Sequence, residues 1–351
     1  MSFIAKAVTN FPEHMATQSA VKNMLINMWP HKREFIEQFT NSTTVETRYL
    51  SLPLNYYRDL NDMGIRNVIW KAEARRLQKE NIQKLLDDTG IDIADIGLIA
   101  SATTTGLTVP SLEALMMNEF PFSPYTKRLP LFGLGCLAGV AGINRVNDYL
   151  IGHPKMAAIL MITELCSLTF RLEDESISNL VGTTLFGDGS GAVLMVGADH
   201  PLSERSQFEI LSSESLFYPE TERLMGWDMI DNGFQLVLSN DIPTLVRDHV
   251  GNNINDFLTR NSVSRSDIDF YIAHPGGPKV LDALSQTLGL DRSKLSLSWQ
   301  SLAQYGNVSA ASVINVLERT IQKNDILHGR AGLMTAMGPA FSLEMSLVRK
   351  C

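Results

Sequence analysis

The sequence predicts a layered α/β fold with a substantially parallel sheet. Short apolar runs at residues 96–102 and 157–163 have the length of buried strands. Segments with helical periodicity alternate with such runs along the chain, which is typical of parallel sheets. A length of 351 residues allows two domain-sized cores. Because the stretch 201–208 is polar, we expect two halves, 1–203 and 204–351.

Residues 1 to about 90 are expected to be mostly helical. Apolar residues recur at helical spacing over 67–88, with charged residues between them. Gly90 is a natural end for this helix because glycine accepts the left-handed conformation of a C-cap. After the first strand, Ser111 is a suitable N-cap for a helix over 111–119.

Cys136 stands between small residues, where the apolar run 128–134 turns into a helix. This helix carries Ile143, Val146 and Leu150 on one face. A thiol at such a turn lies at the helix N-terminus, whose partial positive charge favours the thiolate. Cys136 is therefore a candidate nucleophile, although a lone cysteine is more commonly a small buried hydrophobe.

The later elements repeat this order of strand, turn and helix. Residues 187–191 form a glycine-rich turn before a strand, and their spacing fits no phosphate-binding motif. A strand at 269–273 delivers His274 into a turn of proline and glycine, and Asn307 stands before a helix over 309–322. The other expected elements are strands at 208–213, 233–238, 332–337 and 341–348 and a helix over 243–260.

The composition limits the class of protein. Hydrophobic residues make up 44% and charged residues 19% of the chain, as in ordinary globular proteins. The net charge of −8 provides no general surface for nucleic acid. The cysteines Cys136, Cys166 and Cys351 include no CxxC pair, so we expect neither a disulfide framework nor a metal site, and a cytoplasmic location fits. No apolar run is long enough for stable membrane insertion.

Cys136, His274 and Asn307 together have the capacities that acyl transfer needs. A thiolate attacks a thioester carbonyl, an imidazole stabilises the thiolate, and imidazole and amide N–H groups donate to an oxyanion or enolate. Loss of CO2 generates a carbanion without a carboxylate base, so the set suits decarboxylative Claisen condensation. Taken singly, His274 could be a core histidine and Asn307 an N-cap. Papain-like hydrolases use the same residue types, but their cysteine motif does not occur in this sequence.

Five motifs resemble those of type III polyketide synthases, the chalcone synthase-like family. They run in the family's order from about residue 95 onward: LGCLAG at 134–139, LFGDG at 185–189, AHPGGP at 273–278, YGNVS at 305–309 and MGP at 337–339. The resemblance implies a thiolase-type fold, with two related α/β halves in a layered αβαβα arrangement, and a homodimer. It also implies an acyltransferase that extends an acyl-CoA starter with malonyl-CoA, the CoA thioesters being substrates and no cofactor being needed.

The resemblance assigns roles to individual residues. Cys136 would hold the acyl group, and His274 and Asn307 would form the decarboxylation and oxyanion apparatus. Phe186 resembles the family's aromatic gatekeeper, and the second gatekeeper falls on the smaller Leu236. Four further residues fall at or near the substrate cavity: Thr169, Trp227, Ser309 and Cys166.

Two features depart from the family's pattern. Ala340 stands where relatives usually have the last glycine of a Gly-Pro-Gly turn, and its β-carbon is costly only if the backbone φ is positive. The basic residues that hold CoA phosphates in plant relatives do not map clearly. The candidates are Lys32, Arg33, Arg48 and Arg58.

Residues 130–136, 225–228 and 336–339 look more like bacterial alkylresorcinol and alkylpyrone synthases than plant enzymes. This similarity implies a long-chain fatty acyl starter, two or three malonyl extensions and cyclisation to an alkylpyrone or alkylresorcinol. Side chains at 115–117 and 165–168 could line an apolar tunnel for the starter. Two alternatives stay open: a 3-oxoacyl-ACP synthase III, which condenses once, and a catalytically silent homologue that binds acyl chains.

Overall fold

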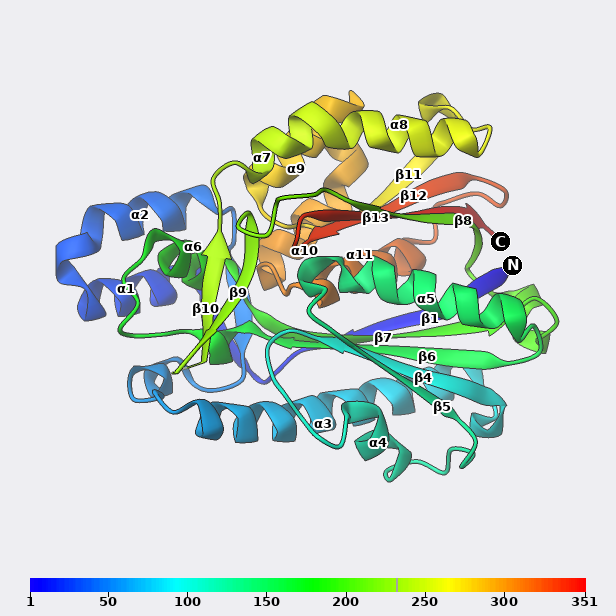
Figure 1. Cartoon of the computed structure of the whole chain (residues 1–351), viewed down its shortest axis with the longest axis horizontal. Helices are drawn as coiled ribbons and strands as arrows, with labels where there is room; N and C mark the ends of the chain where they lie inside the picture. The colour runs from blue at the N-terminus through cyan, green and yellow to red at the C-terminus, as the bar shows by residue number, and fades with distance from the viewer. Residues whose placement is uncertain (232) are drawn as a thin grey trace.

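The computed structural model describes residues 1–231 and 233–351, which form an α/β fold in layers (Figure 1). The strands are β1 (Ser2–Asn10), β2 (His14–Thr17), β3 (Thr47–Leu50), β4 (Ile96–Thr103), β5 (Lys127–Phe132), β6 (Ala157–Leu165), β7 (Asp188–Gly197), β8 (Phe208–Phe217), β9 (Met225–Ile230), β10 (Gly233–Leu238), β11 (Ile268–Ala273), β12 (Ala331–Gly338) and β13 (Ser342–Lys350). The α-helices are α1 (Gln18–Met28), α2 (Arg33–Ser42), α3 (Met63–Thr89), α4 (Leu112–Met117), α5 (Ala138–Gly152), α6 (Ile177–Leu185), α7 (Ile242–Leu245), α8 (Gly251–Arg260), α9 (Pro278–Leu288), α10 (Ser296–Tyr305) and α11 (Ala310–Lys323).

Within the described residues, nine strands form one large sheet in the order β11-β12-β13-β8-β1-β7-β6-β4-β5. The pairs β4 with β5, β4 with β6 and β11 with β12 are parallel, and the other neighbouring pairs are antiparallel. The sheet is therefore mixed, and the prediction of a substantially parallel sheet is wrong for its centre. The parallel units that periodicity revealed lie toward its two ends.

The N-terminal segment corrects a second expectation, because β1 is a central strand and not part of a helix. It pairs with β7 on one side and β8 on the other. Its residues alternate between two cores: Ile4 and Ala7 pack into one, and Ala5 and Val8 pack into another. A strand that is buried on both faces has no polar face, so its sequence lacks the alternation that marks a strand.

Helices and sheet alternate in five layers. One core surrounds the middle helices, and one further core lies under the outer helices on each side. The helices α5 and α11 lie between two parts of the sheet, and their apolar faces form the middle core with β4, β6, β7 and β12 (Figure 1). The long helix α3 covers the outer face of β1, β6 and β7, and α8 and α9 cover the outer face at the other side. This order of layers is the αβαβα arrangement that the family resemblance implies.

Most of the predicted elements are confirmed with small changes at their ends. The helix α3 ends at Gly90, whose φ of 65° is left-handed as expected for a C-cap. The strand β10 has the predicted bounds. Cys136 lies in a short 3-10 turn, η4 (Gly135–Leu137), directly before α5. The predicted order of strand, nucleophile turn and helix is therefore present.

Candidate active site

One cavity of about 300 Å³ brings together residues from both halves of the chain. Its walls include Cys136, His274, Asn307 and Ser309. Cys136 comes from the start of α5, His274 from the end of β11, and the other two from the segment before α11. The cavity therefore lies where the ends of these elements meet, at the level of the middle helical layer.

The turn that carries Cys136 depends on glycine at position 135. Gly135 has a φ of 51°, and a β-carbon there would lie 2.6 Å from the Cδ of Pro339. Both the conformation and the space exclude a larger residue. Pro339 follows the last residue of β12, so the nucleophile turn of the first half packs directly against the closing turn of the second half.

Cys136 begins a chain of buried polar groups. Its Sγ–H donates to the Oγ of Ser309 at 3.5 Å, and the Ser309 hydroxyl donates to Glu164 Oε1 at 3.2 Å. Glu164 also accepts the backbone N–H and the hydroxyl of Thr104, each at 3.1 Å. The chain of hydrogen bonds connects the thiol to a carboxyl group that is fully buried in β6.

Burial determines the protonation of these groups. It raises the pKa of the Cys136 thiol to about 11, and hydrogen bonding with Ser309 and Asn307 opposes this rise only in part. It also raises the pKa of Glu164 to about 7. The expected lowering of the thiol pKa at a helix N-terminus is therefore outweighed by the loss of solvent around the thiol.

His274 is 3% exposed, and neither ring nitrogen has a hydrogen-bond partner among the described residues. Burial lowers the pKa of its imidazole to about 3, so the ring is neutral at rest. The backbone N–H of His274 donates to Thr335 O at 2.9 Å and fixes the loop after β11 to β12. An unpartnered ring in a cavity wall can accept a proton from Cys136 or donate to a bound oxyanion.

Asn307 is held on both sides. Its Nδ2 donates to Gly276 O at 3.0 Å, and its Oδ1 accepts the backbone N–H of Ser309 at 2.8 Å. These bonds leave the second amide proton of Nδ2 for a ligand in the cavity. Ser309 has a φ of 46° and ψ of −131°, a strained backbone that persists because the neighbouring contacts hold it.

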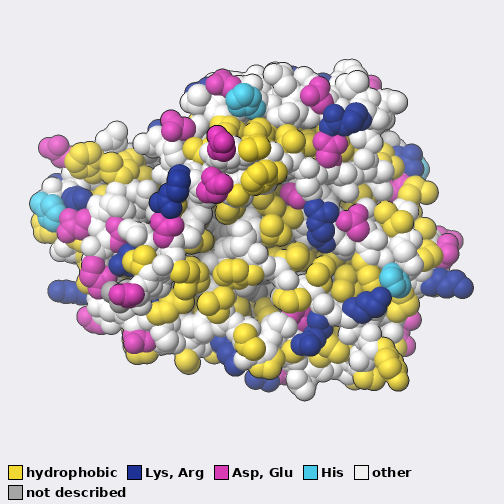
Figure 2. Space-filling view, in the orientation of Figure 1, with side chains coloured by type: hydrophobic (Ala, Val, Ile, Leu, Met, Phe, Trp, Pro, Cys, Tyr) yellow, Lys and Arg dark blue, Asp and Glu magenta, His cyan; other side chains and the backbone are white. Residues whose placement is uncertain are grey.

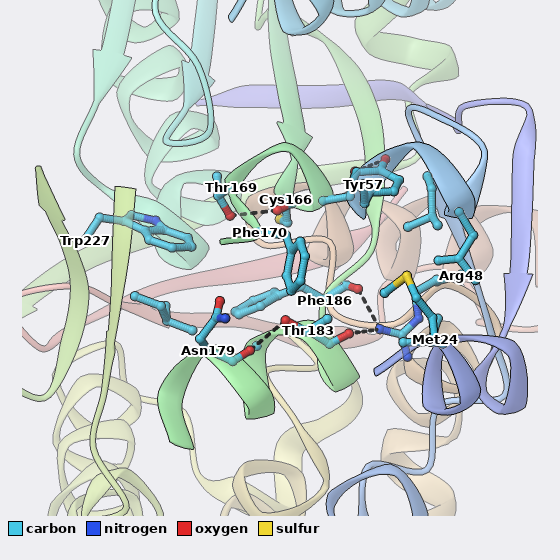
Figure 3. A pocket seen from close by; sticks show the side chains of 16 residues that line it. Met24, Arg48, Tyr57, Cys166, Thr169, Phe170, Asn179, Thr183, Phe186 and Trp227 are labelled. Atoms are coloured by element: carbon cyan, nitrogen blue, oxygen red, sulfur yellow. Dashed lines mark hydrogen bonds between the residues drawn. The ribbon is translucent and has the colours of Figure 1, made fainter. Parts of the chain in front are cut away.

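A smaller pocket of about 50 Å³, which we call the branch, adjoins the cavity and is drawn in Figure 3. Four of the predicted cavity residues line both the main cavity and the branch, namely Phe186, Leu236, Trp227 and Cys166. Thr169 lines the branch but not the main cavity, and its hydroxyl donates to Cys166 O at 2.7 Å. The other large apolar side chains that line the branch are Val21, Met24, Leu50, Leu54 and Phe170.

The segment 115–117 and the four basic candidates lie outside the lining of the main cavity. Met116 is fully buried in the core beneath α3, and the segment 115–117 lines neither the cavity nor the branch. The four basic candidates do not line the main cavity either: Lys32 pairs with Glu175, Arg33 with Glu37, Arg58 is exposed elsewhere, and Arg48 is buried beside the branch. Lys279 is the one lysine or arginine among the described residues that line the cavity, and it is exposed at the start of α9.

Sequence reasoning missed Glu164 and Thr104 as parts of this site. A signal for Glu164 is present, because it is a single carboxylate in the otherwise apolar strand β6. A buried carboxyl group needs hydrogen-bond donors, so its presence there indicates a polar site nearby. Thr104 follows β4 and carries no comparable signal.

No group of three or more His, Cys, Asp or Glu side chains is arranged to hold a metal ion in the part of the chain that the structure describes. No helix there is both long enough and apolar enough to cross a membrane.

Known proteins share the fold and the arrangement of the chain. The models of the N-terminal and C-terminal domains of chalcone and stilbene synthases match residues 3–200 and 209–351. A 1,3,6,8-tetrahydroxynaphthalene synthase of Streptomyces peucetius subsp. caesius is 38% identical over 349 residues, which cover 99% of this chain and 92% of that protein. A putative chalcone synthase of Bacillus subtilis is 35% identical over 358 residues, with coverage of 99% and 98%. The chain therefore belongs to the chalcone and stilbene synthase family.

A solved structure agrees with this assignment. The crystal structure of 1,3,6,8-tetrahydroxynaphthalene synthase from Streptomyces coelicolor A3(2), a bacterial type III polyketide synthase, superposes with a TM-score of 0.94 at 28% identity and covers 99% of each chain. An α-pyrone synthesis polyketide synthase-like protein of Mycobacterium tuberculosis is 28% identical over 355 residues, 98% of this chain and 90% of that protein. The chain is thus a type III polyketide synthase, an acyltransferase with a thiolase-type fold.

Proposed function

We propose that this enzyme condenses malonyl units onto a long-chain fatty acyl starter and cyclises the product to an alkylpyrone or an alkylresorcinol. The starter is delivered as an acyl-CoA thioester, and malonyl-CoA supplies each extension. The name of the mycobacterial relative, an α-pyrone synthesis protein, supports a pyrone as one product class.

The observation that carries the proposal is the apolar branch beside the nucleophile. Phe186 and Leu236 line both the branch and the main cavity, which also contains Cys136. The branch adds the apolar side chains of Val21, Met24, Leu50, Leu54 and Phe170, beside the polar side chains of Arg48, Ser167, Thr169, Asn179 and Thr183. A hydrocarbon chain attached to Cys136 needs such a place, because each buried methylene group contributes about 0.8 kcal/mol. A starter without an alkyl chain would leave this apolar volume without a ligand.

The proposed chemistry follows from the groups in the cavity. The Cys136 proton passes to His274, the thiolate attacks the carbonyl carbon of the starter thioester, and the bond between that carbon and the CoA sulfur breaks. CoA leaves as a thiol with the proton from His274. Malonyl-CoA then loses CO2, and N–H groups of His274 and Asn307 donate to the enolate oxygen. The enolate carbon attacks the acyl carbon bonded to Cys136. The bond between that carbon and the Cys136 sulfur breaks, and the sulfur leaves as a thiolate. Ion-pair formation offsets the burial that opposes each charge alone.

Product masses test the proposal. The protein is incubated with malonyl-CoA and a series of acyl-CoA starters from acetyl to palmitoyl. We expect turnover to rise with chain length and the products to contain the starter plus several two-carbon units. A single two-carbon extension would instead indicate a 3-oxoacyl-ACP synthase III activity, and no turnover with any starter would indicate a silent acyl-binding homologue.

A second candidate is supported by the relative of 38% identity, whose name denotes synthesis of tetrahydroxynaphthalene. An enzyme of this kind would consume malonyl-CoA alone and give an aromatic product with no alkyl chain. The same experiment distinguishes the two, since a reaction with malonyl-CoA alone that long acyl-CoA leaves unchanged contradicts the long-chain starter.

We also propose a cytoplasmic homodimer. Hydrophobic side chains gather across the middle of the face in Figure 2, and the structure leaves Val109 98%, Met229 60% and Phe132 56% exposed. A second copy of the chain would cover such side chains. The three free cysteines fit a reducing compartment. Light scattering should give twice the mass of one chain, and a monomer at micromolar concentration would refute the dimer.

A further inference from the structure

Arg48 is a buried cation beside the junction of the cavity and its branch. It lies on β3, is 1% exposed and lines the branch. Its Nη1 donates to the carbonyl oxygens of Thr183 at 2.8 Å and Phe186 at 2.9 Å, and its Nη2 donates to Thr184 O at 2.8 Å. Figure 3 shows the guanidinium directed at the carbonyl groups of Thr183 and Phe186.

These carbonyl groups belong to the end of α6. The last carbonyl groups of a helix have no partner within it and carry partial negative charge. A guanidinium offers five donors in a rigid fork, so one side chain can satisfy three of them. Because Phe186 directly follows α6, Arg48 fixes the backbone from which the Phe186 ring projects.

The other side of the same segment is bonded to Asn307. The backbone N–H of Asn307 donates to Leu185 O at 2.9 Å, and the N–H of Gly187 donates to Asn307 O at 3.0 Å. The segment 185–187 is therefore held between Arg48 and Asn307. Any shift of this segment moves the Phe186 ring and the Asn307 amide together.

Arg48 keeps its charge despite burial. Burial lowers the pKa of the guanidinium to about 10, and the nearby carboxyl group of Asp188 opposes that lowering. The group is thus protonated at neutral pH. Gln18 Oε1 also accepts a hydrogen bond from Nη2, and the Gln18 amide donates to Thr184 O at 2.9 Å, so the contact with the end of α6 is doubled.

We propose that Arg48 is a positioning residue that sets the passage between the cavity and the branch by holding Phe186, and that it couples this passage to Asn307. The proposal depends on the proposed function for the identity of the starter that uses the passage. It does not require Arg48 to touch the substrate. Loss of the guanidinium hydrogen bonds to α6 and Phe186 should change which acyl chains reach Cys136, in addition to any change in the stability of the fold.

The experiment compares Arg48→Met and Arg48→Lys with the matched control Arg66→Met. Arg66 is 4% exposed and donates from Nε to Leu60 O at 2.9 Å, but lines neither the cavity nor the branch. Access is measured as the rate at which N-ethylmaleimide and N-dodecylmaleimide alkylate Cys136, followed by peptide mass spectrometry. Alkylation needs no turnover, so this readout is independent of whether the proposed reaction occurs.

Arg48→Met should change the ratio of the two alkylation rates about tenfold, since a shift of about 1 Å in a positioned group has effects of this order or larger. Arg48→Lys retains the charge without the fork and should change the ratio in the same direction by less. It also provides the test if Arg48→Met does not fold. Arg66→Met should lower the unfolding temperature of the protein but keep the wild-type ratio of the two alkylation rates. An unchanged ratio in the folded Arg48 variants, or an equal change in Arg66→Met, overturns the proposal.

Discussion

Cys136 is a half-buried thiol that is neutral at neutral pH, so its ionisation depends on its neighbours. Its pKa is raised to about 11 by burial, while the ring of His274, whose pKa is lowered to about 3, faces the same loss of solvent. Neither group ionises alone at neutral pH. Both side chains line the same cavity, so a proton passed from Cys136 to His274 would create two opposite charges that attract each other.

Cys136→Ala should abolish covalent loading of the starter. The alanine methyl group cannot form a thioester, so intact-protein mass spectrometry after incubation with acyl-CoA should show the acyl mass on the wild type and not on the variant. Cys351→Ala, which removes a thiol outside the cavity, is the control and should load normally. Loading of Cys136→Ala at the wild-type level would place the nucleophile elsewhere.

Glu164 makes stability depend on pH. Burial raises its pKa from 4.5 to about 7, so the folded protein keeps a proton that the unfolded chain releases. Stability should therefore fall as pH rises from about 4.5 to about 7 and then level off. Asp188, whose pKa burial raises to about 6, contributes with the same sign at lower pH.

Glu164→Gln removes the titration and keeps an oxygen that can accept from Thr104. The variant should show a smaller loss of thermal unfolding temperature between pH 5 and pH 8 than the wild type. The change of unfolding temperature with pH that remains in the variant comes from Asp188 and other groups. An identical slope in both proteins would mean that Glu164 is ionised in the folded protein throughout this range.

The turns show which parts of the site could be predicted. The nucleophile turn is a local feature, since its apolar strand, small residues and helix follow one another, and it was placed correctly. The bond between Ser309 and Glu164 joins residues 145 positions apart and has no local signal. The strand β1 was missed for a related reason, because burial between two cores removes the polar alternation that identifies strands.

The closing turn after β12 carries strain that the sequence suggested but could not establish. Ala340 has a φ of 56°, so its backbone is in the left-handed conformation. Glycine adopts this conformation without cost, whereas the β-carbon of alanine makes it unfavourable. Ala340→Gly should stabilise the fold by about 1 kcal/mol, because a left-handed L-residue costs roughly 1–2 kcal/mol and the freedom of glycine in the unfolded chain offsets part of it. Urea unfolding measures the change, and a loss of stability would show that other contacts hold Ala340 in place.

The hairpin of β9 and β10 forms the wall between cavity and branch. Leu236 pairs across the hairpin with Trp227, and its Cδ2 lies only 2.6 Å from where a β-carbon on Gly182 would be. Leu236→Phe adds volume at a site packed against α6, so the ring should narrow the passage. The ratio of kcat/KM for palmitoyl-CoA to that for hexanoyl-CoA should fall about tenfold, the loss of about 1.4 kcal/mol expected for part of a chain no longer buried.

Gln235→Phe is the matched control for this variant. Gln235 is adjacent on β10 but lines neither the cavity nor the branch, so the added ring should leave the ratio unchanged. A preserved preference for palmitoyl-CoA in Leu236→Phe would show that the chain does not pass between Leu236 and Phe186.

At the scale of the whole molecule, residues from both halves line one cavity. Cys136 and Phe186 come from the half that ends near residue 203, and His274 and Asn307 come from the other. The middle core contains α5 and α11 side by side, one from each half. The site is incomplete without both halves, which explains why no single segment of the sequence contains its chemistry.

The charge of the molecule adds a constraint on how substrates bind. The net charge is −8, and acyl-CoA carries several phosphate charges, so the average field repels the substrate. At 0.1 M salt, interactions beyond about 10 Å are largely screened, so a single lysine at the cavity mouth outweighs the distant carboxylates. Lys279 is exposed in the cavity wall at the start of α9, where helix N–H groups also favour anions.

Lys279→Ala should raise the KM for acyl-CoA about tenfold and leave kcat nearly unchanged. A hydrogen bond to a charged group contributes about 1.5 kcal/mol, and a contact far from the reacting carbon stabilises ground state and transition state equally. The variant should also lose most of the increase in KM that added salt causes in the wild type. Lys71→Ala, an exposed change on α3 at the opposite side of the sheet, should do neither. Equal KM values for wild type and Lys279→Ala would mean that the CoA phosphates lie away from the start of α9.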